Sequence, residues 1–522
     1  VAYRLIEPGE AAVAGAGGGT DILGALVHGV RHVTAIEVNP AIPALLREDL
    51  AAFSGNPYGW NTVTPVIADG RAFLQATEKR FDLIQIALLD SFTAAAAGVY
   101  ALSESYVYTV EALALYLDRL NGRGAVAVTR WLKTPPRDTL KLFATAVEAC
   151  ERAGIAQPER HLVFIRSWNT GTIVVTRAPL TDTHIEAVRA FCRARWFDLC
   201  YLPGLRREEA NRYTVLDTPV YYDFAQAVLF GDRERAYRDA FFHLRPATDD
   251  CPYFFRFVKW PSLVSLVREM GAPWIPYVEW GYLTLIATLC QAAVAGAVLV
   301  CLPLVTLRRL PGTGALRWTA LYFTALGFGY MFLELAFIQK FMLFLAYPVY
   351  AVAVVLTAFP IFSGIGSLAA NRIRARRIVA LATVVCALIA LAAAYQAGLD
   401  AVFRACAALP DAAKTALGVA LLAPFAFLMG VPFPLGLQWV SDHAPALLPW
   451  VWGINGCASV AGACLATTFA VHFGFRAAVS AGGAAYLLAC LALSRFVRLG
   501  PDGGSARTIT GGAVIRGAMP GD

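Results

Sequence analysis

The sequence predicts a doubly wound α/β soluble domain followed by an all-α transmembrane bundle, and three observations support this fold class. Charged residues concentrate in positions 1–270, whereas long apolar runs recur from about position 280 onward. Positions 11–130 alternate short apolar strands with helical segments. Hydrophobic residues make up 58% of the 522-residue chain and charged residues only 16%. A composition this apolar requires that much of the surface faces lipid.

The soluble domain opens with a strand and a glycine-rich loop. We expect a strand over positions 11–14, a helix over 21–28 and a second strand that ends near Glu37, with the loop V-A-G-A-G-G-G-T-D joining the first two. This loop then lies at the carboxyl end of the first strand. Glycines there let the backbone approach a ligand closely, and the first turn of the helix offers free N–H groups.

Two acids follow the loop at the ends of the next strands. Glu37 lies 22 residues after Gly15, where a carboxylate can accept both ribose hydroxyls of a nucleoside. Asp69, in T-P-V-I-A-D-G-R, ends the third strand and could contact an adenine amino group. Either acid could instead cap a helix. Together with the glycine loop, the two acids predict a site for a nucleoside-containing ligand.

The order of these motifs resembles the spermidine synthase family, a branch of the S-adenosylmethionine methyltransferase fold. The resemblance covers about residues 10–130 and also rests on F-D-L-I-Q-I and S-E-S-Y. It implies a Rossmann-like methyltransferase fold, and S-adenosylmethionine or decarboxylated S-adenosylmethionine as the cofactor. The cofactor-binding residues that we expect are Gly15, Gly17, Gly18, Gly19, Asp21, Glu37, Asp69 and Gly70.

The chain departs from this family at the position of the catalytic base. In spermidine synthases, an amine attacks the carbon next to a sulfonium. The first acid of a D-x-x-D segment removes a proton from the ammonium form of that amine. The corresponding segment here reads A-L-L-D, so Ala87 stands at the first position and Asp90 at the last. We expect Asp90 to be the catalytic residue, with the cap of the next helix as its alternative role. Methyl transfer, another acceptor and cofactor sensing without turnover all remain open.

Further residues are candidates for contact with the acceptor. Tyr106, in S-E-S-Y, could line an acceptor pocket or belong to the core. Asp249 and Asp250 precede an aromatic cluster and could attract a cationic substrate, although a solvated turn before Pro252 is the favoured alternative. The seven histidines form no spaced set and the eleven cysteines no C-x-x-C pair, so we expect no metal site.

The second half of the chain contains seven apolar spans. One of them, G-Y-M-F-L-E-L-A-F-I-Q-K-F, carries Glu334 and Lys340, and a carboxylate at that depth is tolerated when it faces a partner or a polar cavity. Lys340 could instead extend to the membrane surface. Another span is broken by G-V-P-F-P-L-G, as happens beside midplane binding sites. The spans are positions 280–307, 318–345, 347–369, 378–399, 415–438, 450–472 and 476–496.

These segments, with T-D-D-C-P-Y-F-F and W-G-I-N-G, look like a bacterial group of multi-span proteins that carry a spermidine-synthase-like domain. That group usually has further spans upstream, so we expect an N-terminally truncated chain. The division that we predict is a cofactor domain over 1–180, an α/β extension and interfacial connector over 181–278, a transmembrane helical domain over 279–497 and a flexible tail over 498–522.

The expected function is that of a membrane-bound transferase that alkylates an amine or a membrane-associated acceptor with a methyl or aminopropyl group. A transporter or sensor that binds the cofactor or a polyamine without catalysis is the alternative, and a structural membrane protein with an inactive domain is a third. The expected partners are the lipid bilayer and a small amine or lipid acceptor. Nucleic acid is not expected, because the basic residues behind the net charge of +7 are dispersed. The oligomeric state stays open, and a dimer is possible.

The expected location is the bacterial inner membrane, with the soluble domain in the cytoplasm. Arginine clusters over 308–317, 372–377 and 495–498 are separated by even numbers of spans and therefore share one side. The positive-inside rule makes that side cytoplasmic and would leave the soluble domain outside. Adenosyl sulfonium cofactors are cytosolic, and we give that argument more weight.

Overall fold

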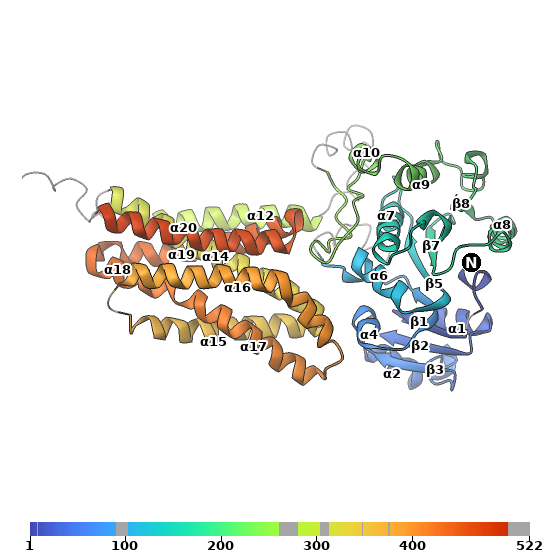
Figure 1. The fold of residues 1–522 in the computed structure, drawn as a ribbon, viewed down its shortest axis with the longest axis horizontal. Helices are drawn as coiled ribbons and strands as arrows, with labels where there is room; N and C mark the ends of the chain where they lie inside the picture. Colours follow the sequence, from blue (N-terminus) through green and yellow to red (C-terminus); the bar gives the residue numbers. More distant parts are fainter. Residues whose placement is uncertain are drawn as a thin grey trace, which may run out of the picture.

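The computed structural model describes residues 1–7, 9–89, 103–259, 280–302, 313–346, 348–373 and 376–499. An N-terminal mixed α/β domain of the methyltransferase type is followed by a bundle of long helices (Figure 1). The fold class is therefore the one that the sequence predicts. The four domain boundaries themselves stay predictions.

Among the described residues, eight strands form one sheet in the order β3-β2-β1-β4-β5-β7-β6-β8. Strands β1 to β5 are parallel, whereas β7, β6 and β8 continue the sheet in antiparallel fashion. β8 lies beyond position 180, so the predicted extension contributes a strand to the same sheet. The strands are β1 Glu10–Ala14, β2 His32–Glu37, β3 Val63–Ile67, β4 Phe81–Ile86, β5 Leu120–Trp131, β6 Leu162–Arg166, β7 Thr170–Thr176 and β8 Asp198–Tyr201.

Helices cover both faces of this sheet. They are α1 Thr20–Val27, α2 Ala41–Arg47, α3 Ala51–Ser54, α4 Gly70–Ala76, α6 Val110–Asp118, α7 Asp138–Arg152, α8 Asp182–Arg195, α9 Val220–Phe230 and α10 Arg233–Asp239. Alternate residues of β1 enter different cores: Ala12 packs with α4, α6, α7 and α9, whereas Val13 packs with α1, α2 and α8. A strand buried on both faces needs a continuous apolar run, and E-A-A-V-A supplies one.

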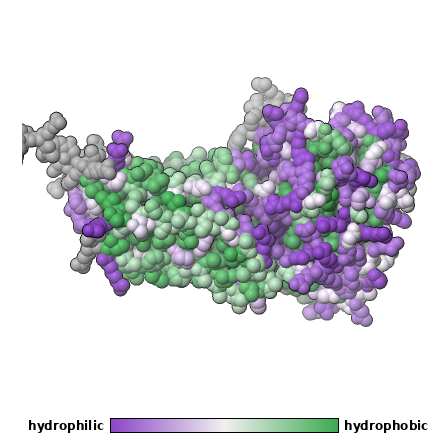
Figure 2. All heavy atoms as spheres, viewed as in Figure 1, coloured by the Kyte–Doolittle hydropathy of each residue, from purple (hydrophilic) through white to green (hydrophobic). Residues whose placement is uncertain are grey.

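The second domain consists of long helices whose outer surface is apolar (Figure 2). Seven helical stretches in the described part of the chain are long and apolar enough to cross a membrane, as the hydropathy pattern predicts. α17 and α18 together make one of them, broken near Gly430. The helices are α12 Trp280–Gly296, α14 Thr313–Leu345, α15 Pro348–Ala370, α16 Arg377–Ala405, α17 Asp411–Gly430, α18 Pro432–His443, α19 Leu448–Phe473 and α20 Phe475–Leu499.

The soluble domain and the arginine-rich helix ends lie at opposite ends of the bundle (Figure 1). α14 reaches the soluble domain at its C-terminal end, where Gln339 binds Glu104. α15 starts at that end and runs away from it, so that Arg377, at the start of α16, lies on the far side. The conflict between arginine bias and a cytoplasmic soluble domain therefore persists in three dimensions.

Candidate functional site

The glycine loop leaves β1 at the carboxyl edge of the parallel strands. Gly15, Gly17 and Gly19 adopt φ of +74°, +47° and +88°, a region in which an L side chain is strained. Gly18 has ordinary φ, but a Cβ placed on it would have no heavy atom within 4 Å. The loop therefore combines a backbone that requires glycine with open space above Gly18.

Glu37 holds this loop from the end of β2. Its carboxylate accepts hydrogen bonds from the amide of Gly17 at 3.0 Å and from the amide of Asn39 at 3.0 Å, and the residue is 6% exposed. A carboxylate has about four lone-pair positions, so about two stay free for other donors. The side chain thus positions the loop and retains the capacity to accept ribose hydroxyls.

Tyr58 also supports the glycine loop, and the sequence did not predict this role. Its hydroxyl donates to the carbonyl oxygen of Gly17 at 2.6 Å, and the residue is almost fully buried. Pro57 packs directly on Gly19. The signal in the sequence is the segment N-P-Y-G after α3, which resembles an ordinary turn and gives no hint of its contact across the domain.

Asp69 and Gly70 lie at the same sheet edge as the glycine loop. The amide of Ala68 donates to the backbone carbonyl of Glu37 at 3.1 Å. A Cβ on Gly70 would come within 2.8 Å of the Cβ of Ala14, so only glycine lets α4 start this close to the end of β1. Asp69 accepts from the amide of Ala72 at 2.9 Å as the cap of α4. Asp69 therefore caps α4 and also lies beside the glycine loop.

The end of β4 presents apolar side chains to this edge. Ala87 is buried, and Leu89 occupies the space over Gly15, where the resemblance places the amino acid or amine end of the donor. Asp21, in the first turn of α1, accepts from the Nε2 of Gln85 at 2.6 Å, and burial raises its pKa. Asp90, the expected catalytic residue, lies outside the described residues.

A cavity of about 170 Å³ lies between the soluble domain and the membrane domain. Asp69, Glu104 and Tyr106 line it from the soluble side, and Met342 and Leu343 of α14 from the membrane side. Burial raises the pKa of both carboxyl groups. Two acids of raised proton affinity therefore line a cavity that borders the membrane domain.

Tyr106 and Glu104 also attach the soluble domain to α14. The Nε2 of Gln339 donates to the carboxylate of Glu104 at 2.8 Å and to the hydroxyl oxygen of Tyr253 at 2.9 Å. The hydroxyl of Tyr106 donates to the backbone carbonyl of Gln339 at 2.9 Å. The polar Gln339 within a membrane span is explained by this contact.

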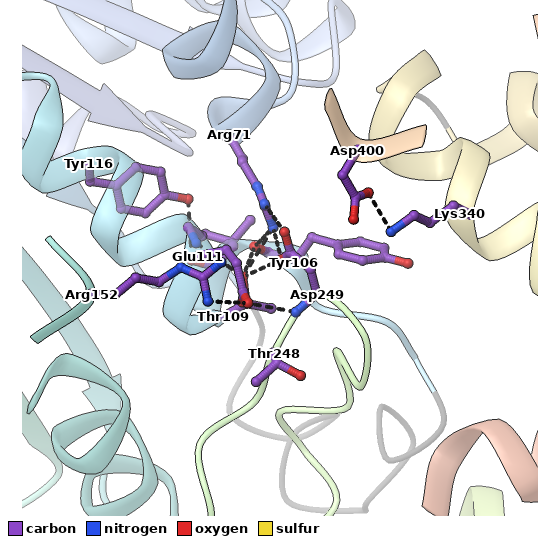
Figure 3. A network of polar contacts seen from close by, with 12 residues as sticks. Arg71, Tyr106, Thr109, Glu111, Tyr116, Arg152, Thr248, Asp249, Lys340 and Asp400 are labelled. Carbon is purple, nitrogen blue, oxygen red and sulfur yellow. Dashed lines mark hydrogen bonds and ion pairs between the residues drawn. The ribbon is translucent and has the colours of Figure 1, made fainter. Parts of the chain in front are cut away.

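Asp249 forms an ion pair with Arg71 instead of a solvated turn (Figure 3). Both carboxylate oxygens accept from the guanidinium at 2.6 Å, and the hydroxyl of Thr109 donates to one of them at 2.7 Å. The pair is mostly buried. Because Asp249 already has a cationic partner, its capacity to attract a cationic substrate is largely used, and the solvated-turn interpretation was wrong.

Asp250 contacts the membrane domain. The first two amides of α20 donate to it: the amide of Phe475 to its backbone carbonyl at 2.9 Å, and the amide of Arg476 to its carboxylate at 2.9 Å. The guanidinium of Arg256 donates to the carbonyl of Val471, near the end of α19, at 2.6 Å. The connector thus supplies hydrogen-bond partners to both helix ends at this turn of the bundle.

The two ionisable residues of α14 have different environments. Lys340 pairs with Asp400 at 2.5 Å near the junction between the domains. Glu334 is 6% exposed, inside the bundle. It is remote from the sheet edge, so the structure does not bring it together with Glu37 and Asp69. Within the described ranges, no group of three or more His, Cys, Asp or Glu side chains could hold a metal ion.

No family model and no curated protein matches the chain. Among solved structures, spermidine synthase from Thermotoga maritima is 16% identical over 44% of this chain and 70% of its own, with a TM-score of 0.28. A probable spermidine synthase from Corynebacterium glutamicum is 15% identical over 35% of this chain and 62% of its own, with a TM-score of 0.26. A putative methyltransferase from Streptococcus mutans, solved with SAH, is 14% identical over 34% of this chain and 92% of its own, with a TM-score of 0.23. Similarities this weak carry no argument about activity.

Proposed function

We propose that the chain is a membrane-bound transferase that uses S-adenosylmethionine or decarboxylated S-adenosylmethionine to alkylate an amine or a membrane-associated acceptor. The observation that supports this function best is the grouping of Glu37, the glycine loop and Asp69 at one sheet edge, next to the cavity against α14. The donor would occupy the sheet edge, and the acceptor would reach it through the cavity.

The residues present fit an adenosyl group. Free lone pairs on Glu37 can accept hydrogen bonds from the ribose hydroxyls, and the open space above Gly18 leaves room for the ligand. Asp69 is the residue that we expect to contact the adenine. The cofactor would supply an activated carbon next to a sulfonium. Tyr58 keeps the loop in place by fixing the carbonyl of Gly17, which limits the reorganisation needed on binding.

Removal of a proton from an amine acceptor requires a base, and Ala87 cannot be that base. Of the described acids, Asp69 and Glu104 line the cavity, and their raised pKa makes each a stronger base than an exposed carboxylate. We assign this role to Glu104, because Asp69 is the acid that we assign to the adenine of the donor. Asp90 stays a second candidate.

A membrane-associated acceptor fits the position of the cavity. Its membrane side consists of Met342, Leu343 and Ala346, at the end of α14. An amphiphilic amine could place its apolar part against these residues and its amino group near Glu104. A soluble acceptor would have no use for an apolar wall, which is why we favour an acceptor held at the membrane surface.

The first experiment measures donor binding by calorimetry on the purified full-length chain. Wild type should bind S-adenosylmethionine, its decarboxylated form or both, and Glu37→Ala should weaken binding at least tenfold, because it removes the acceptor of the ribose hydroxyls and of the Gly17 amide. Glu48→Ala is the matched control, since Glu48 is exposed. Equal heats for wild type and Glu37→Ala would refute the donor site.

The second experiment incubates the chain with donors labelled in the methyl or aminopropyl group and with candidate amines and amphiphilic amines. Transfer of label, reduced in Glu104→Gln, is the expected result. Donor binding without any transfer would favour the second candidate function, a sensor, which the loss of the acid at Ala87 and the cover of Leu89 over Gly15 support.

A further inference from the structure

A second cavity, of about 410 Å³, lies within the membrane bundle. Its lining residues come from five of the seven spans, and most of them lie in the middle part of their span, whereas Ser367 lies near one end of Val349–Ala370. Tyr330 is near the centre of Leu316–Leu345, and Tyr486 near the centre of Phe475–Val497. The cavity is therefore at mid-depth, about half a helix length from the interdomain cavity. Its volume is that of a site for a small organic molecule.

The lining is mostly apolar, includes several polar side chains and carries no cationic one. Hydroxyl and amide groups face the space, from Tyr330, Ser363, Ser367, Asn455, Ser459 and Tyr486. The Nδ2 of Asn455 donates one of its two hydrogens to the carbonyl of Phe323 at 3.1 Å, and the side-chain oxygen is left as an acceptor. An apolar lining that carries hydroxyl and amide oxygens but no Lys or Arg is suited to a ligand with an apolar part and a positively charged hydrogen-bond donor.

Two prolines that line the cavity remove helical hydrogen bonds, and one of them frees a carbonyl of the lining. Pro434 has no amide hydrogen, so the carbonyl of Gly430, four residues earlier, lacks its helical donor, and both residues line the cavity. Pro360, which also lines it, does the same to the carbonyl of Leu356 within α15. The break between α17 and α18 thus places backbone oxygen next to the cavity, in the manner of discontinuous membrane helices at ligand sites.

The carboxyl group of Glu334 lies near this space, although Glu334 is not one of the lining residues. It lies one helical turn beyond Tyr330 on the same face of α14, and its charge acts on the hydroxyls of Tyr330 and Tyr486. The residue is 6% exposed, and no hydrogen bond or ion pair links its carboxylate to another residue in the described part of the chain. An uncompensated carboxylate in a membrane span costs a few kcal/mol. A bound cation would remove that cost.

We propose that this mid-depth cavity binds a small organic cation of the primary alkylamine class, with Glu334 as its counter-charge and the hydroxyl, amide and freed carbonyl oxygens as acceptors of its N–H groups. Three observations carry the proposal together: hydroxyl and amide groups in a lining without basic residues, a helix break that exposes carbonyl oxygen, and a buried carboxyl group one helical turn from the lining residue Tyr330. The site is independent of the donor site at the sheet edge.

The test measures binding of n-butylamine to the full-length chain in lipid nanodiscs, with n-butanol as the neutral molecule of the same shape. Wild type should bind n-butylamine at a saturable site that Ser367→Phe removes, and n-butanol should not bind at that site. Glu334→Gln should weaken amine binding about tenfold to a hundredfold, because a hydrogen-bonded charge pair is lost. Ser367→Phe should abolish binding by filling the cavity, and it leaves Glu334 unchanged.

Asp400→Asn is the matched control, since it removes one negative charge from the same domain at the junction, beside Lys340. It should leave the affinity of the mid-depth cavity for n-butylamine unchanged, and Glu104→Gln identifies any amine that binds in the interdomain cavity instead. Absence of saturable binding to wild type would overturn the proposal, and so would equal affinity in wild type and Ser367→Phe. If Glu334→Gln does not elute from size-exclusion chromatography as a folded, monodisperse protein, the comparison of wild type with Ser367→Phe tests the proposal alone.

Discussion

Asp249 and Asp250 are adjacent in the chain and bind opposite domains. The carboxylate of Asp249 forms a two-bond ion pair with Arg71 of the soluble domain, and that of Asp250 accepts from the Arg476 amide at the start of α20. A single peptide unit therefore links the α/β domain to the bundle. The position of the interdomain cavity relative to the sheet edge depends on this link.

Loss of Arg71 should weaken this link. Arg71→Ala leaves the carboxylate of Asp249 half-buried without its cation, and removal of one partner of a buried pair costs on the order of 3 kcal/mol. Chemical denaturation of the detergent-solubilised chain should show this loss. Arg207→Ala, which removes an exposed ion pair with Asp223, should leave the denaturation midpoint unchanged. Equal midpoints for the two variants would show that the Arg71 pair is not important for stability.

The glycines of the loop should separate stability from ligand binding. Gly17→Ala requires an L side chain at φ +47°, which costs about 1 to 2 kcal/mol in stability. Gly18→Ala meets no neighbour and no positive φ, so it should leave stability nearly unchanged. Its methyl group would enter the open space above the loop and should lower donor affinity. Thermal unfolding and calorimetry on both variants check the two effects, and full donor affinity in Gly18→Ala would place the donor elsewhere.

Glu104 should make stability depend on pH. Burial raises its pKa above the ordinary value of 4.5, so the folded chain binds this proton more tightly than the unfolded chain. The stabilising contribution is fully present below pH 4.5 and is lost as pH rises through the raised folded pKa. Denaturation across this range should show a decline in wild type that is smaller in Glu104→Gln, which keeps the oxygen that accepts from Gln339. Identical pH profiles would contradict the raised pKa.

The orientation of the bundle gives a prediction with two exclusive outcomes. α20 begins beside Asp250 at the soluble domain and is 25 residues long, so its end lies about 37 Å away, across a membrane thickness. If the soluble domain is cytoplasmic, as we propose, alkaline phosphatase fused to the C-terminus should be active and green fluorescent protein dark. An inactive phosphatase and a fluorescent green fluorescent protein would agree with the positive-inside rule. This result would exclude a cytosolic donor.

Much of the fold could be predicted because it depends on local patterns. The loop after β1, the helix that follows it and the seven spans all appear as composition or periodicity within 10 to 30 residues. Glu37 and Asp69 could be found for the same reason, since the carboxyl ends of parallel strands meet at one edge of a sheet. The interdomain contacts could not be found in this way: the 235 positions between Glu104 and Gln339 leave no periodic signal.

The sequence by itself determined which segments are strands, which are long and apolar enough to span a membrane and which acids lie at the carboxyl edge of the parallel strands, because hydrophobic periodicity and strand order decide these properties. Only the tertiary structure decided the roles of the buried and partly buried polar residues. Gln339 joins two domains, Asp249 neutralises Arg71, and Glu334 stands beside a mid-depth cavity. The physical reason is that a buried polar group takes its role from the partner that satisfies it, and that partner is brought near by packing, not by neighbourhood in the chain.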